Sequence, residues 1–474
     1  MRFELLTAAQ IEAIHGASIR VLEKTGVRLS HPPALQLFRA AGAAVSADRV
    51  RIPERLVMES LGGCVRQFSI FGRDRRRKSR FGFGERSYNS TAGQAHWVDD
   101  AFLCRRPAML ADVAVAARIA EALDGITIAG AMSDPSELPV SYRSVAVAAE
   151  LLRNTTKPVA FWFHDRPSAK YILELFALVA GGEKEAAACP FAYPLLEPIS
   201  PLRFPHHGVD LLFETCRYPL PVMIGPMAQV GATAPATLAG TLVQENAEIL
   251  AGISLVQLIR RGTPVGYGGI PHAFDMRTTQ LIFAGPEQVL MAVAMTQMGR
   301  HYNLPVYINV GLTDSKTVDA QAGLEAGTTL ALGALSGADI FGHLGISGVD
   351  QAASLTMLVM QNELIGFVER LMAGIEVSEE TLATEVIDSV ASREGGFLGE
   401  EHTATHFRRE LWFPRLLDRQ FWQGWLDSGA KDLMTRCTEK KNRILSSLAI
   451  EPVDEKIDRE MSRIVASARA ELSE

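Results

Sequence analysis

The sequence predicts an α/β fold, a closed (β/α)8 barrel of the TIM type, from three observations. Eight short runs of apolar, β-branched and aromatic residues recur between positions 87 and 343. Longer segments with helical periodicity separate these runs, which is typical of parallel βα units. No GxGxxG turn follows the first run, and this disfavours the alternative, a doubly wound open sheet. Eight strands that are each followed by a helix are the number that closes a barrel.

The eight predicted strands are all short and rich in apolar residues. In chain order they span 87–91, 126–132, 158–164, 190–196, 221–226, 264–269, 305–310 and 338–343. Helices fit between them, most clearly at 107–123, 141–154, 245–261 and 286–302. This alternation assigns residues 86–374 to one barrel, which we expect to be the catalytic domain.

The segments on either side of the barrel have a different character. Residues 1–85 begin with the amphipathic stretch "TAAQIEAIHGASIRVLEKTG" and continue with hairpin-like pieces, which predicts a small α+β cap. The basic run "RDRRRKSR" at 73–80 predicts the solvated turn of a hairpin, with docking to an anionic surface as the alternative. Residues 375–474 are mostly helical and charged, and predict a C-terminal helical extension. Aromatic residues within 401–425 predict that this segment covers one barrel end or a partner chain.

The composition is that of a globular chain. With 474 residues, 47% hydrophobic and 21% charged, and a mean hydropathy of +0.10, the chain can bury a large core. The formal net charge of −7 argues against nucleic acid as a partner. No apolar run reaches the roughly 18 residues of a membrane span, because polar residues at 244–246 and 248 interrupt the longest one.

The sequence also predicts a cytoplasmic location. Its first residues lack the basic and then apolar segments of a signal peptide. Five scattered cysteines form no CxxC pair, so we expect reduced thiols and no cysteine-built metal site. They are Cys64, Cys104, Cys189, Cys216 and Cys437.

The ends of the predicted strands carry the candidate site residues, because the loops after the strands form the active sites of this fold. The aromatic candidates for substrate binding are Tyr88, Trp162, Phe163, Tyr267 and Phe341. The polar candidates for substrate binding are Asn89, Glu197, Gln229, His272, Asn309 and Lys316. Core packing is the alternative for each aromatic, and structural hydrogen bonding for each histidine. No HExxH, Cys/His pair or GxxxxGK(S/T) motif supports a protease, a zinc hydrolase or a P-loop enzyme.

The stretch "LPVYINVGLTDSK" ends a predicted strand with four polar residues in a row. Asp314 and Ser315 are placed to cap a helix that begins near Thr317, by accepting hydrogen bonds from its first N–H groups. Asp314 and Lys316 are also expected to face the barrel mouth, and the two roles are compatible.

Three long segments carry a resemblance to a known family. They read "GLTDSKTVDAQAGLEAGTTLALGALSGADIFGHLG", "PMAQVGATAPATLAGTLVQENAEILAGISLVQLIRRGTPVGYGG" and "GGFLGEEHTATHFRRELWFPRLLDRQFWQGW". Together with "LTAAQIEAIHGASIRVLEKTGV" near the start, they resemble the trimethylamine methyltransferase family over nearly the whole chain. The founding members of that family are archaeal TIM-barrel enzymes that carry pyrrolysine in the catalytic site and methylate the Co(I) of a small corrinoid protein. Characterised bacterial relatives without pyrrolysine resemble demethylases of glycine betaine and similar quaternary amines.

This sequence contains no non-standard residue, so the resemblance implies the branch without pyrrolysine. A quaternary ammonium loses its methyl group as a neutral amine leaves, whereas the tertiary amine trimethylamine needs activation. The implied function is a methyltransferase that moves a methyl group from glycine betaine or a similar trimethylammonium compound to Co(I). No DxHxxG motif that would bind cobalamin occurs, so we expect the corrinoid on a separate partner protein and no bound metal in this chain. We also expect a homo-oligomer.

The charge of such a substrate implies roles for the strand-end residues. Aromatic faces hold a trimethylammonium through cation–π contacts of roughly 0.5–2 kcal/mol each. A betaine carboxylate needs donors, which His343, Asn309 and His272 are placed to supply. Gly342 and Gly345 lack side chains and are expected to leave room beside His343 for a corrin ring.

Two functions of other classes are the alternatives. A catalytically silent sensor of quaternary amines would present a similar pocket, although the polar barrel mouth favours an enzyme. A TIM-barrel lyase would use Lys316 to form a Schiff base, but Lys316 lies several residues beyond its strand, whereas such a lysine is usually desolvated within the barrel. We therefore expect Asp314 and His343 to be the catalytic residues of a methyltransferase.

Overall fold

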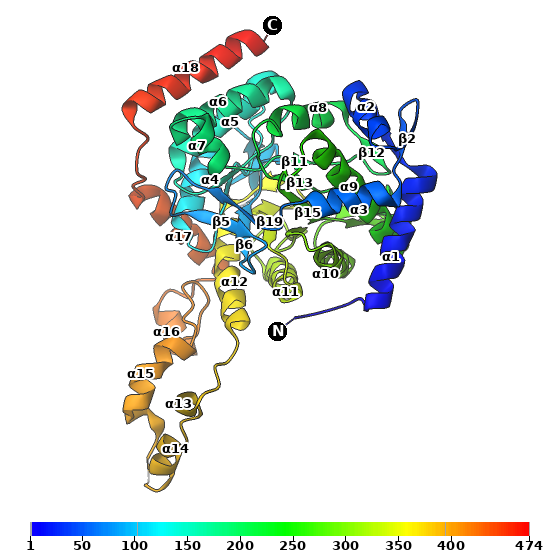
Figure 1. Ribbon diagram of the computed structural model, residues 1–474. Helices are drawn as coiled ribbons and strands as arrows, with labels where there is room; N and C mark the ends of the chain where they lie inside the picture. The colour runs from blue at the N-terminus through cyan, green and yellow to red at the C-terminus, as the bar shows by residue number, and fades with distance from the viewer. Residues whose placement is uncertain (1, 102, 394, 474) are drawn as a thin grey trace.

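The computed structural model describes residues 2–101, 103–393 and 395–473. Eight parallel strands form a barrel at its centre (Figure 1). They are β6 (Ser87–Ser90), β9 (Ala129–Gly130), β10 (Val159–Ala160), β11 (Leu195–Leu196), β13 (Val222–Ile224), β15 (Val265–Gly269), β18 (Val306–Asn309) and β19 (Ile340–Leu344). Each lies on one of the eight predicted runs, so the predicted TIM barrel is confirmed.

Hydrogen bonds between neighbouring segments close the barrel. The strands β11, β13, β15, β18, β19 and β6 form one continuous sheet in that order, and β9 pairs with β10. An isolated parallel bridge between Asn89 and Ile128 joins β6 to the segment that enters β9. The Val159 N–H donates to the Phe191 carbonyl at 2.9 Å and joins β10 to the segment that enters β11. The ring of strands is therefore complete.

One helix follows each barrel strand and packs on its outer side. These helices are α4 (Leu110–Ala122), α5 (Val140–Asn154), α6 (Arg166–Ala180), α8 (His206–Thr215), α9 (Leu238–Ile259), α10 (Pro286–His301), α11 (Ala320–Ser336) and α12 (Leu355–Ala373). A short helix, α7 (Glu183–Ala188), extends α6. The four predicted helices are all present. Helix α9 begins at Leu238 rather than at 245, because the apolar residues before 245 continue its buried surface.

Helix α9 is long and apolar enough to span a membrane, and most of it is buried in the protein. It packs against the barrel, the N-terminal helices and α10. Its polar side chains have partners inside the protein. Glu245 accepts from the N–H groups of Ala228 and Ile270, each at 3.1 Å, and Glu248 accepts from the Ser200 hydroxyl at 2.7 Å. Its composition is therefore that of a core helix with satisfied polar groups.

The N-terminal segment forms an α+β layer that shares the barrel's core. Its elements are α1 (Ala8–Arg20), a π-helical turn (Val21–Thr25), β1 (Val27–Leu29), α2 (Pro32–Ala40), β2 (Ala44–Ser46), β3 (Arg49–Arg51) and α3 (Glu54–Gly63). The sheet β12-β1-β3-β2 includes β12 (Arg203–Phe204) from the loop after β11. This shared strand and the shared core attach the segment firmly to the barrel.

The hairpin predicted around the basic run is present as β4 (Phe68–Phe71) and β5 (Lys78–Phe81). Three of its aromatic and aliphatic side chains, Phe68, Ile70 and Phe81, pack against the lower interior of the barrel. The interior side chains in this cluster are Ile128, Ala160, Tyr193, Met223, Ile270, Tyr307 and Ile340. The hairpin thus closes the N-terminal end of the barrel, and functional groups are left to the other end.

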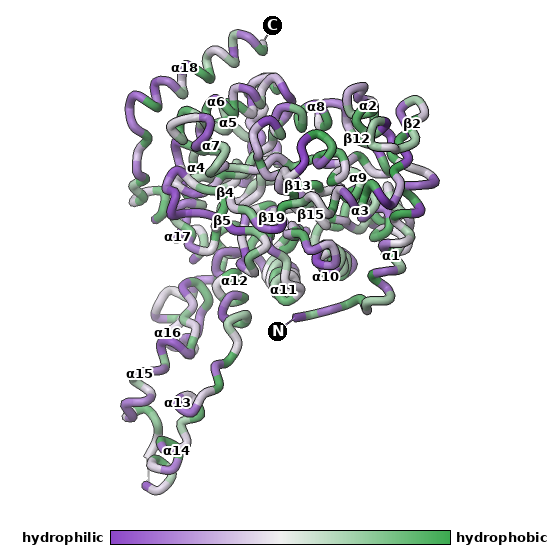
Figure 2. The backbone as a smooth tube through the Cα atoms, in the orientation of Figure 1, coloured by the Kyte–Doolittle hydropathy of each residue, from purple (hydrophilic) through white to green (hydrophobic). Residues whose placement is uncertain are grey.

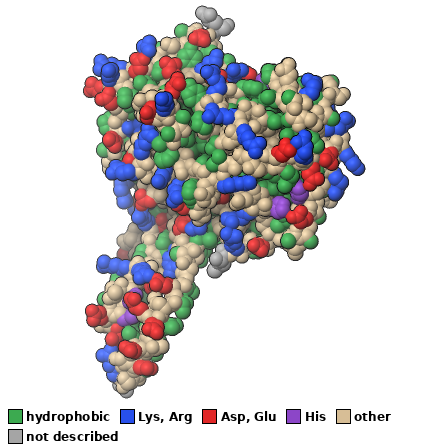
Figure 3. All heavy atoms as spheres, in the orientation of Figure 1, with side chains coloured by type: hydrophobic (Ala, Val, Ile, Leu, Met, Phe, Trp, Pro, Cys, Tyr) green, Lys and Arg blue, Asp and Glu red, His purple; other side chains and the backbone are tan. Residues whose placement is uncertain are grey.

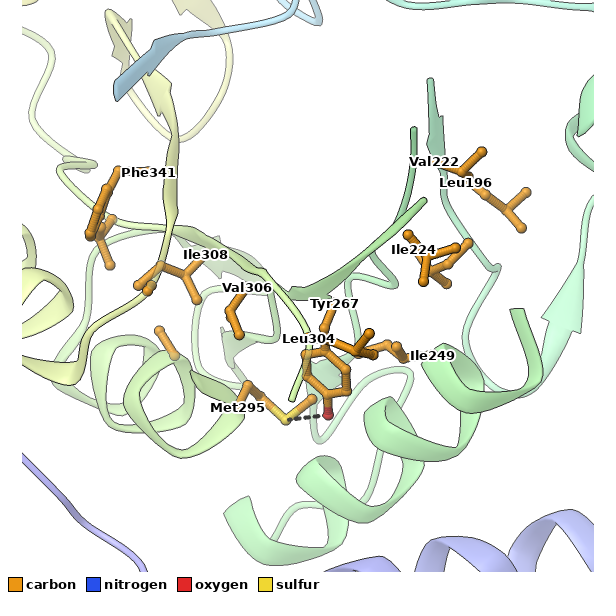
Figure 4. Close-up of a cluster of buried hydrophobic side chains, with 14 of the residues drawn as sticks. Leu196, Val222, Ile224, Ile249, Tyr267, Met295, Leu304, Val306, Ile308 and Phe341 are labelled. Carbon is orange, nitrogen blue, oxygen red and sulfur yellow. Dashed lines mark hydrogen bonds between the residues drawn. The ribbon is translucent and has the colours of Figure 1, made fainter. Parts of the chain in front are cut away.

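The main core lies between the strands and the surrounding helices. Figure 4 shows side chains that point outward from the strands toward Ile249 of α9 and Met295 of α10. The outward-pointing strand residues in this view are Leu196, Val222, Ile224, Tyr267, Val306, Ile308 and Phe341. Because side chains alternate along a strand, their neighbours in sequence point into the barrel.

Short strands stand over the C-terminal end of the barrel, which we call the mouth. One small sheet contains β14 (Gln229–Val230), β16 (His272–Asp275) and β17 (Gln280–Ile282). Another contains β7 (Trp97–Ala101), β8 (Cys104–Pro107), β20 (Ile346–Ser347) and β21 (Ala352–Ala353). These strands come from the loops after β6, β13, β15 and β19, and they frame the mouth.

The C-terminal part divides into an arm and two returning helices. The arm, residues 375–427, contains α13 (Glu379–Leu382), α14 (Thr384–Ala391), a 3-10 turn (Phe397–Gly399), α15 (Glu401–Glu410) and α16 (Trp422–Asp427). It projects away from the body of the protein (Figure 1). Helix α17 (Leu433–Ser447) returns to α12 and α4, and α18 (Glu455–Leu472) packs on α5 and α6. The expectation that residues 401–425 cover a barrel end is therefore wrong.

Candidate functional site

The upper interior of the barrel is lined by polar side chains. Strand β18 illustrates the arrangement: Val306 and Ile308 belong to the outer core, whereas Tyr307 belongs to the interior cluster. The same alternation turns Asn309 inward, one layer closer to the mouth. Asn89 of β6 also points inward, since its amide nitrogen donates to the Tyr193 hydroxyl at 3.2 Å. The barrel interior therefore changes from apolar near the hairpin to polar at the mouth.

His343 is held in an unusual backbone conformation at the end of β19. Its φ is +75°, in the left-handed region that non-glycine residues seldom adopt. The register of β19 against β6 shifts between Phe341 and Leu344, so His343 lies in an irregularity of the sheet. Such irregularities re-aim side chains near active sites. The imidazole is directed into the buried mouth as a result.

The contacts of His343 define its hydrogen-bonding state. The Thr91 hydroxyl donates to Oε1 of Gln94 at 2.7 Å, which orients the Gln94 amide so that its nitrogen lies 3.2 Å from Nε2 of His343. Burial, followed by the charge of His272, lowers the pKa of His343 to about 3. The ring is therefore neutral at pH 7, with Nε2 accepting from Gln94 and Nδ1–H free to donate.

His272 stacks on Phe283 with ring centroids 4.9 Å apart, and Phe283 also contacts His343 at 5.7 Å. Burial lowers the pKa of His272 to about 4, so this ring is neutral as well. Its Nδ1 lies 2.8 Å from the Ile270 carbonyl, to which Nδ1–H donates. Nε2 then presents a lone pair to the mouth and cannot donate to a substrate carboxylate. The predicted donor role of His272 is wrong for this reason.

Two half-buried carboxyl groups accompany these rings. Glu197 follows β11, and Asp350 lies in the turn between β20 and β21. Burial raises the pKa of Glu197 to about 7, and burial followed by the charge of Glu197 raises the pKa of Asp350 to about 7. Among the described residues, no lysine or arginine forms an ion pair with either group. Asp350 lies 3.7 Å from Nε2 of His343, but a neutral imidazole does not form an ion pair.

Several buried polar atoms around the mouth have no hydrogen-bond partner among the residues that the structure describes. They are Oδ1 of Asn89, Nε1 of Trp162, Nε2 of His272, Oδ1 of Asn309 and Oδ1 of Asp350. Nearly all buried polar atoms in native proteins are hydrogen-bonded, so such a group marks a place where a ligand or water binds. These atoms come from five different strands or loops, and the mouth is where those segments converge.

A cavity of about 850 Å³ opens beside the mouth over the ends of β10 and β11. Trp162 and Glu197 are among its lining residues. Its lining also includes the Arg143–Asp134 ion pair at 2.5 Å, with His96 3.7 Å from Asp134. The volume lies within the range of small-molecule sites. Glu197 therefore borders a cavity that is large enough for a small molecule.

The structure brings six of the predicted site residues together at the mouth or its cavity. They are Asn89, Trp162, Glu197, His272, Asn309 and His343. Phe163 borders the cavity, but its ring stacks on Phe161 at 4.8 Å and packs with Phe176 on the outer side of the barrel. The aromatic group that faces the cavity from this strand is therefore Trp162.

Three predicted aromatic residues point the other way, and this part of the prediction is wrong. The Tyr88 ring stacks on Phe341 at 5.0 Å, and its hydroxyl donates to Glu369 of α12. Tyr267 points outward, where its hydroxyl donates to Asn246 of α9 at 2.8 Å (Figure 4). All three side chains fill the space between strands and helices and cannot contact a ligand in the barrel.

The polar cluster after β18 also differs from the prediction. Helix α11 begins at Ala320 and is capped by Asp319, not by Asp314 or Ser315. Asp314 accepts from the N–H of Phe283 at 2.9 Å, so it ties two mouth loops together. Lys316 is exposed and donates to the Asp314 carbonyl at 2.8 Å. Since it is neither buried nor inside the barrel, Lys316 does not fit a Schiff-base role.

Gln229 and the two glycines near His343 also lie differently from what the sequence predicted. Gln229 lies in β14, where its carbonyl accepts from a tight turn beyond the mouth. A Cβ at Gly342 would lie 2.1 Å from the Tyr307 hydroxyl, and one at Gly345 would lie 2.3 Å from the Met132 methyl group. Protein atoms occupy the space that the sequence suggested for a corrin ring, so that expectation is wrong.

Sequence reasoning missed Asp350 and Gln94. Asp350 lies in a turn after the last strand, and Gln94 lies in the loop after the first. Both residues lie beyond the strand ends from which the site residues were predicted. The glycine-rich segment "GISGVDQ", which contains Asp350, could have indicated a tight turn at this place. Three successive residues in it do have left-handed φ values of about +60°.

Comparisons with known proteins agree with this architecture. The model of the family "Trimethylamine methyltransferase (MTTB)" matches residues 1–473. The chain is 32% identical to the trimethylamine methyltransferase MttB of Desulfitobacterium hafniense (strain DSM 10664 / DCB-2) over 465 residues, which cover 98% of this chain and 93% of that protein. It is 30% identical to the glycine betaine methyltransferase of Desulfitobacterium hafniense (strain Y51) over 475 residues, which cover 100% and 98% of the two chains.

Among solved structures, the fold resembles the crystal structure of the Methanosarcina barkeri monomethylamine methyltransferase (MtmB). The TM-score is 0.51 at 12% identity, and the match covers 100% of this chain and 88% of the other. At this identity the match supports the fold alone. By contrast, the matches to the family model and to the two relatives extend over almost the whole sequence. The chain therefore belongs to the trimethylamine methyltransferase (MTTB) family.

Proposed function

We propose that this protein transfers a methyl group from a quaternary amine, glycine betaine or a close analogue, to the Co(I) of a corrinoid carried by a separate protein. Family membership supports methyltransferase chemistry, and the relative named glycine betaine methyltransferase supports this class of donor. The observation that carries the proposal is the pair of half-buried carboxyl groups, Glu197 and Asp350, with which no described arginine or lysine forms an ion pair.

Two half-buried carboxyl groups without a cation suit a ligand that supplies the positive charge. A trimethylammonium group has no N–H to donate, so it is held by electrostatic attraction and by aromatic faces rather than by hydrogen bonds. Glu197 and Trp162 line the same cavity, which gives a carboxylate and an aromatic face in one place. Bringing the cation between the carboxyl groups favours their ionised forms and strengthens its own binding.

The carboxylate of a betaine would need hydrogen-bond donors close to the carboxyl groups that hold the cation. Trp162 Nε1–H has no partner among the described residues, and the Nδ1–H of His343 is free to donate. Trp162 follows β10 by two residues and lines the cavity beside the mouth, whereas His343 lies in β19 at the mouth itself. A zwitterionic substrate thus matches the mixture of half-buried acids and neutral donors better than a simple amine does.

The corrinoid is a substrate in this reaction, the methyl acceptor. Its Co(I) supplies the electron pair of the new bond, while the broken C–N bond leaves its pair on nitrogen and releases a neutral tertiary amine. The side chains of this chain orient the donor and exclude water. Since Tyr307 and Met132 fill the space beside Gly342 and Gly345, the acceptor would approach from the open side of the mouth.

Methyl transfer can be tested with the purified protein, Co(I) cobalamin and a panel of amines. We expect quaternary amines, above all glycine betaine, to methylate cobalamin, which changes its visible absorbance, while trimethylamine stays inert. Transfer from trimethylamine would contradict the leaving-group argument. Tight binding of quaternary amines without transfer to cobalamin, or to a corrinoid protein from the same organism, would instead identify a sensor.

A further inference from the structure

The arm, residues 375–427, has almost no core of its own. Of its described residues only Val390 and Leu416 are buried. The tube coloured by hydropathy has green segments at several places along the arm, between purple ones and far from the body (Figure 2). A segment of this length that buries so little apolar surface cannot offset the conformational entropy lost when it becomes ordered. Its ordered structure therefore points to a surface that another molecule covers.

Large apolar side chains are exposed along the arm, and Figure 3 shows them at its surface. Leu398 is 97% exposed and Phe421 is 94% exposed. The full set on the arm is Ile375, Val377, Leu382, Ile387, Phe397, Leu398, Leu411, Phe413, Phe421, Trp422 and Leu426. Phe367 and Leu371, on the adjoining end of α12, continue this exposed surface. Scattered exposed apolar residues are ordinary, but such a concentration in one segment marks an interaction site.

The base of the arm is held firmly against α12. Oε1 of Glu363 accepts from the N–H groups of Arg415 and Leu416 at 2.7 and 2.9 Å. The Arg370 guanidinium donates to the Glu410 carbonyl at 2.7 Å. These contacts fix the direction in which the arm leaves the body, so the arm presents a defined surface rather than a loose tail.

We propose that the arm docks a second copy of this chain. Each exposed aromatic side chain of the arm, and that of Phe367, buries about 200 Å² when it is fully covered. Their exposed fractions of 45–94% then correspond to roughly 600 Å² of surface that a partner could cover. Adding the exposed aliphatic residues brings the surface to the scale of about 800 Å² per partner that stable interfaces bury. A second copy is present whenever the chain folds, and symmetric homodimers are the commonest assemblies of soluble chains.

The position of the arm argues against the methyl acceptor protein as its occupant. Helix α12 starts at Leu355 beside the mouth and ends at Ala373 on the opposite face of the barrel. Glu369, near that end, binds Arg86 and Tyr88 at the start of β6. The arm therefore leaves from the face remote from the site, where a protein that must reach the mouth gains nothing by docking.

The test compares molar masses of wild type and variants by light scattering after gel filtration at micromolar concentration. We expect the wild type at twice the 51.6 kDa chain mass, or an even multiple of it. The double variant Phe421→Glu/Trp422→Glu should elute as a folded monomer, because burying two new carboxylates would disrupt the interface. The matched control Leu324→Glu changes a residue on α11 that is 70% exposed, and should keep the wild-type mass.

Circular dichroism melting of both variants shows whether the body remains folded. Since the changed arm residues contact little of the body, we expect the melting of the barrel to persist in the monomeric variant. A monomeric wild type would mean that a different partner covers the arm, and would overturn the proposal. The wild-type mass in the double variant would overturn it as well.

Discussion

Replacing Glu197 by glutamine is expected to lower kcat/KM for methyl transfer from glycine betaine about 100-fold, or about 2.7 kcal/mol of transition-state stabilisation. Glutamine keeps the size of the side chain but removes the negative charge that would hold the trimethylammonium group. Because burial alone raises the pKa of this carboxyl to about 7, the ionised form is unfavourable in the free protein. The variant should therefore melt at the wild-type temperature or above it, although it has lost activity.

The combination of lost activity and retained stability distinguishes a binding group from a structural one. A structural carboxyl group, such as that of Glu245, would lose stability on the same change, because each of its two oxygens accepts a backbone N–H and an amide NH2 cannot accept the second. Glu287→Gln, on the exposed first turn of α10, serves as the matched control and should stay within twofold of wild type. Wild-type kinetics for Glu197→Gln would remove Glu197 from the site.

Replacing His343 by alanine is expected to lower kcat/KM by at least about tenfold, or about 1.4 kcal/mol. The change removes the free Nδ1–H donor and the ring that separates Gln94, Asp350 and Phe283. Alanine adopts a φ of +75° less readily than histidine, so the change does not relieve the backbone strain. Folding should nevertheless persist, because the side chain of His343 lies at the mouth and outside the hydrophobic core clusters.

Asparagine tolerates a left-handed backbone and carries a donor, so His343→Asn should recover part of the loss. Steady-state kinetics with glycine betaine would separate a change in KM, expected for a lost substrate contact, from a change in kcat. If His343→Ala keeps wild-type kinetics, the imidazole only fills space. Equal activity of the alanine and asparagine variants would show that no donor is needed at this position.

The barrel could be predicted because its eight strands are separate apolar runs. Such a run is still recognised as a strand when its predicted ends are wrong by one or two residues. The direction of a side chain is not predicted correctly after such an error, since neighbouring residues on a strand point to opposite faces. Tyr88, Tyr267 and Phe341 lie beside inward-facing positions and yet point into the outer core. Asn89 and Asn309 each follow an outward-facing residue, Tyr88 and Ile308, by one position and point inward.

The remaining errors come from loops. Glu197 was found because it directly follows a strand, whereas Asp350 reaches the mouth from a hairpin turn whose conformation depends on β7 and β21. The role of Asp314 could not be derived from its neighbours in sequence, because its partner is the N–H of Phe283 on another loop. Hydrogen bonds between loops depend on the closed barrel, so local patterns do not predict them.

The most direct test of the account is the pH dependence of glycine betaine binding, measured by calorimetric titration. Neither end of glycine betaine changes charge near neutral pH, so any dependence comes from the protein. Glu197 and Asp350, with pKa values of about 7, are partly protonated at that pH, and a bound cation favours their ionised forms. Binding below pH 7 must therefore expel protons, which weakens it, whereas above about pH 8 both groups are already ionised.

We predict an affinity that rises from pH 6 to pH 8 and then levels off, with proton release at pH 7 detected in buffers of different ionisation enthalpy. The Glu197→Gln/Asp350→Asn variant should bind weakly at every pH and release no protons. An affinity that is constant or falls between pH 6 and pH 8 in the wild type would contradict the claim that these two carboxyl groups hold the cation.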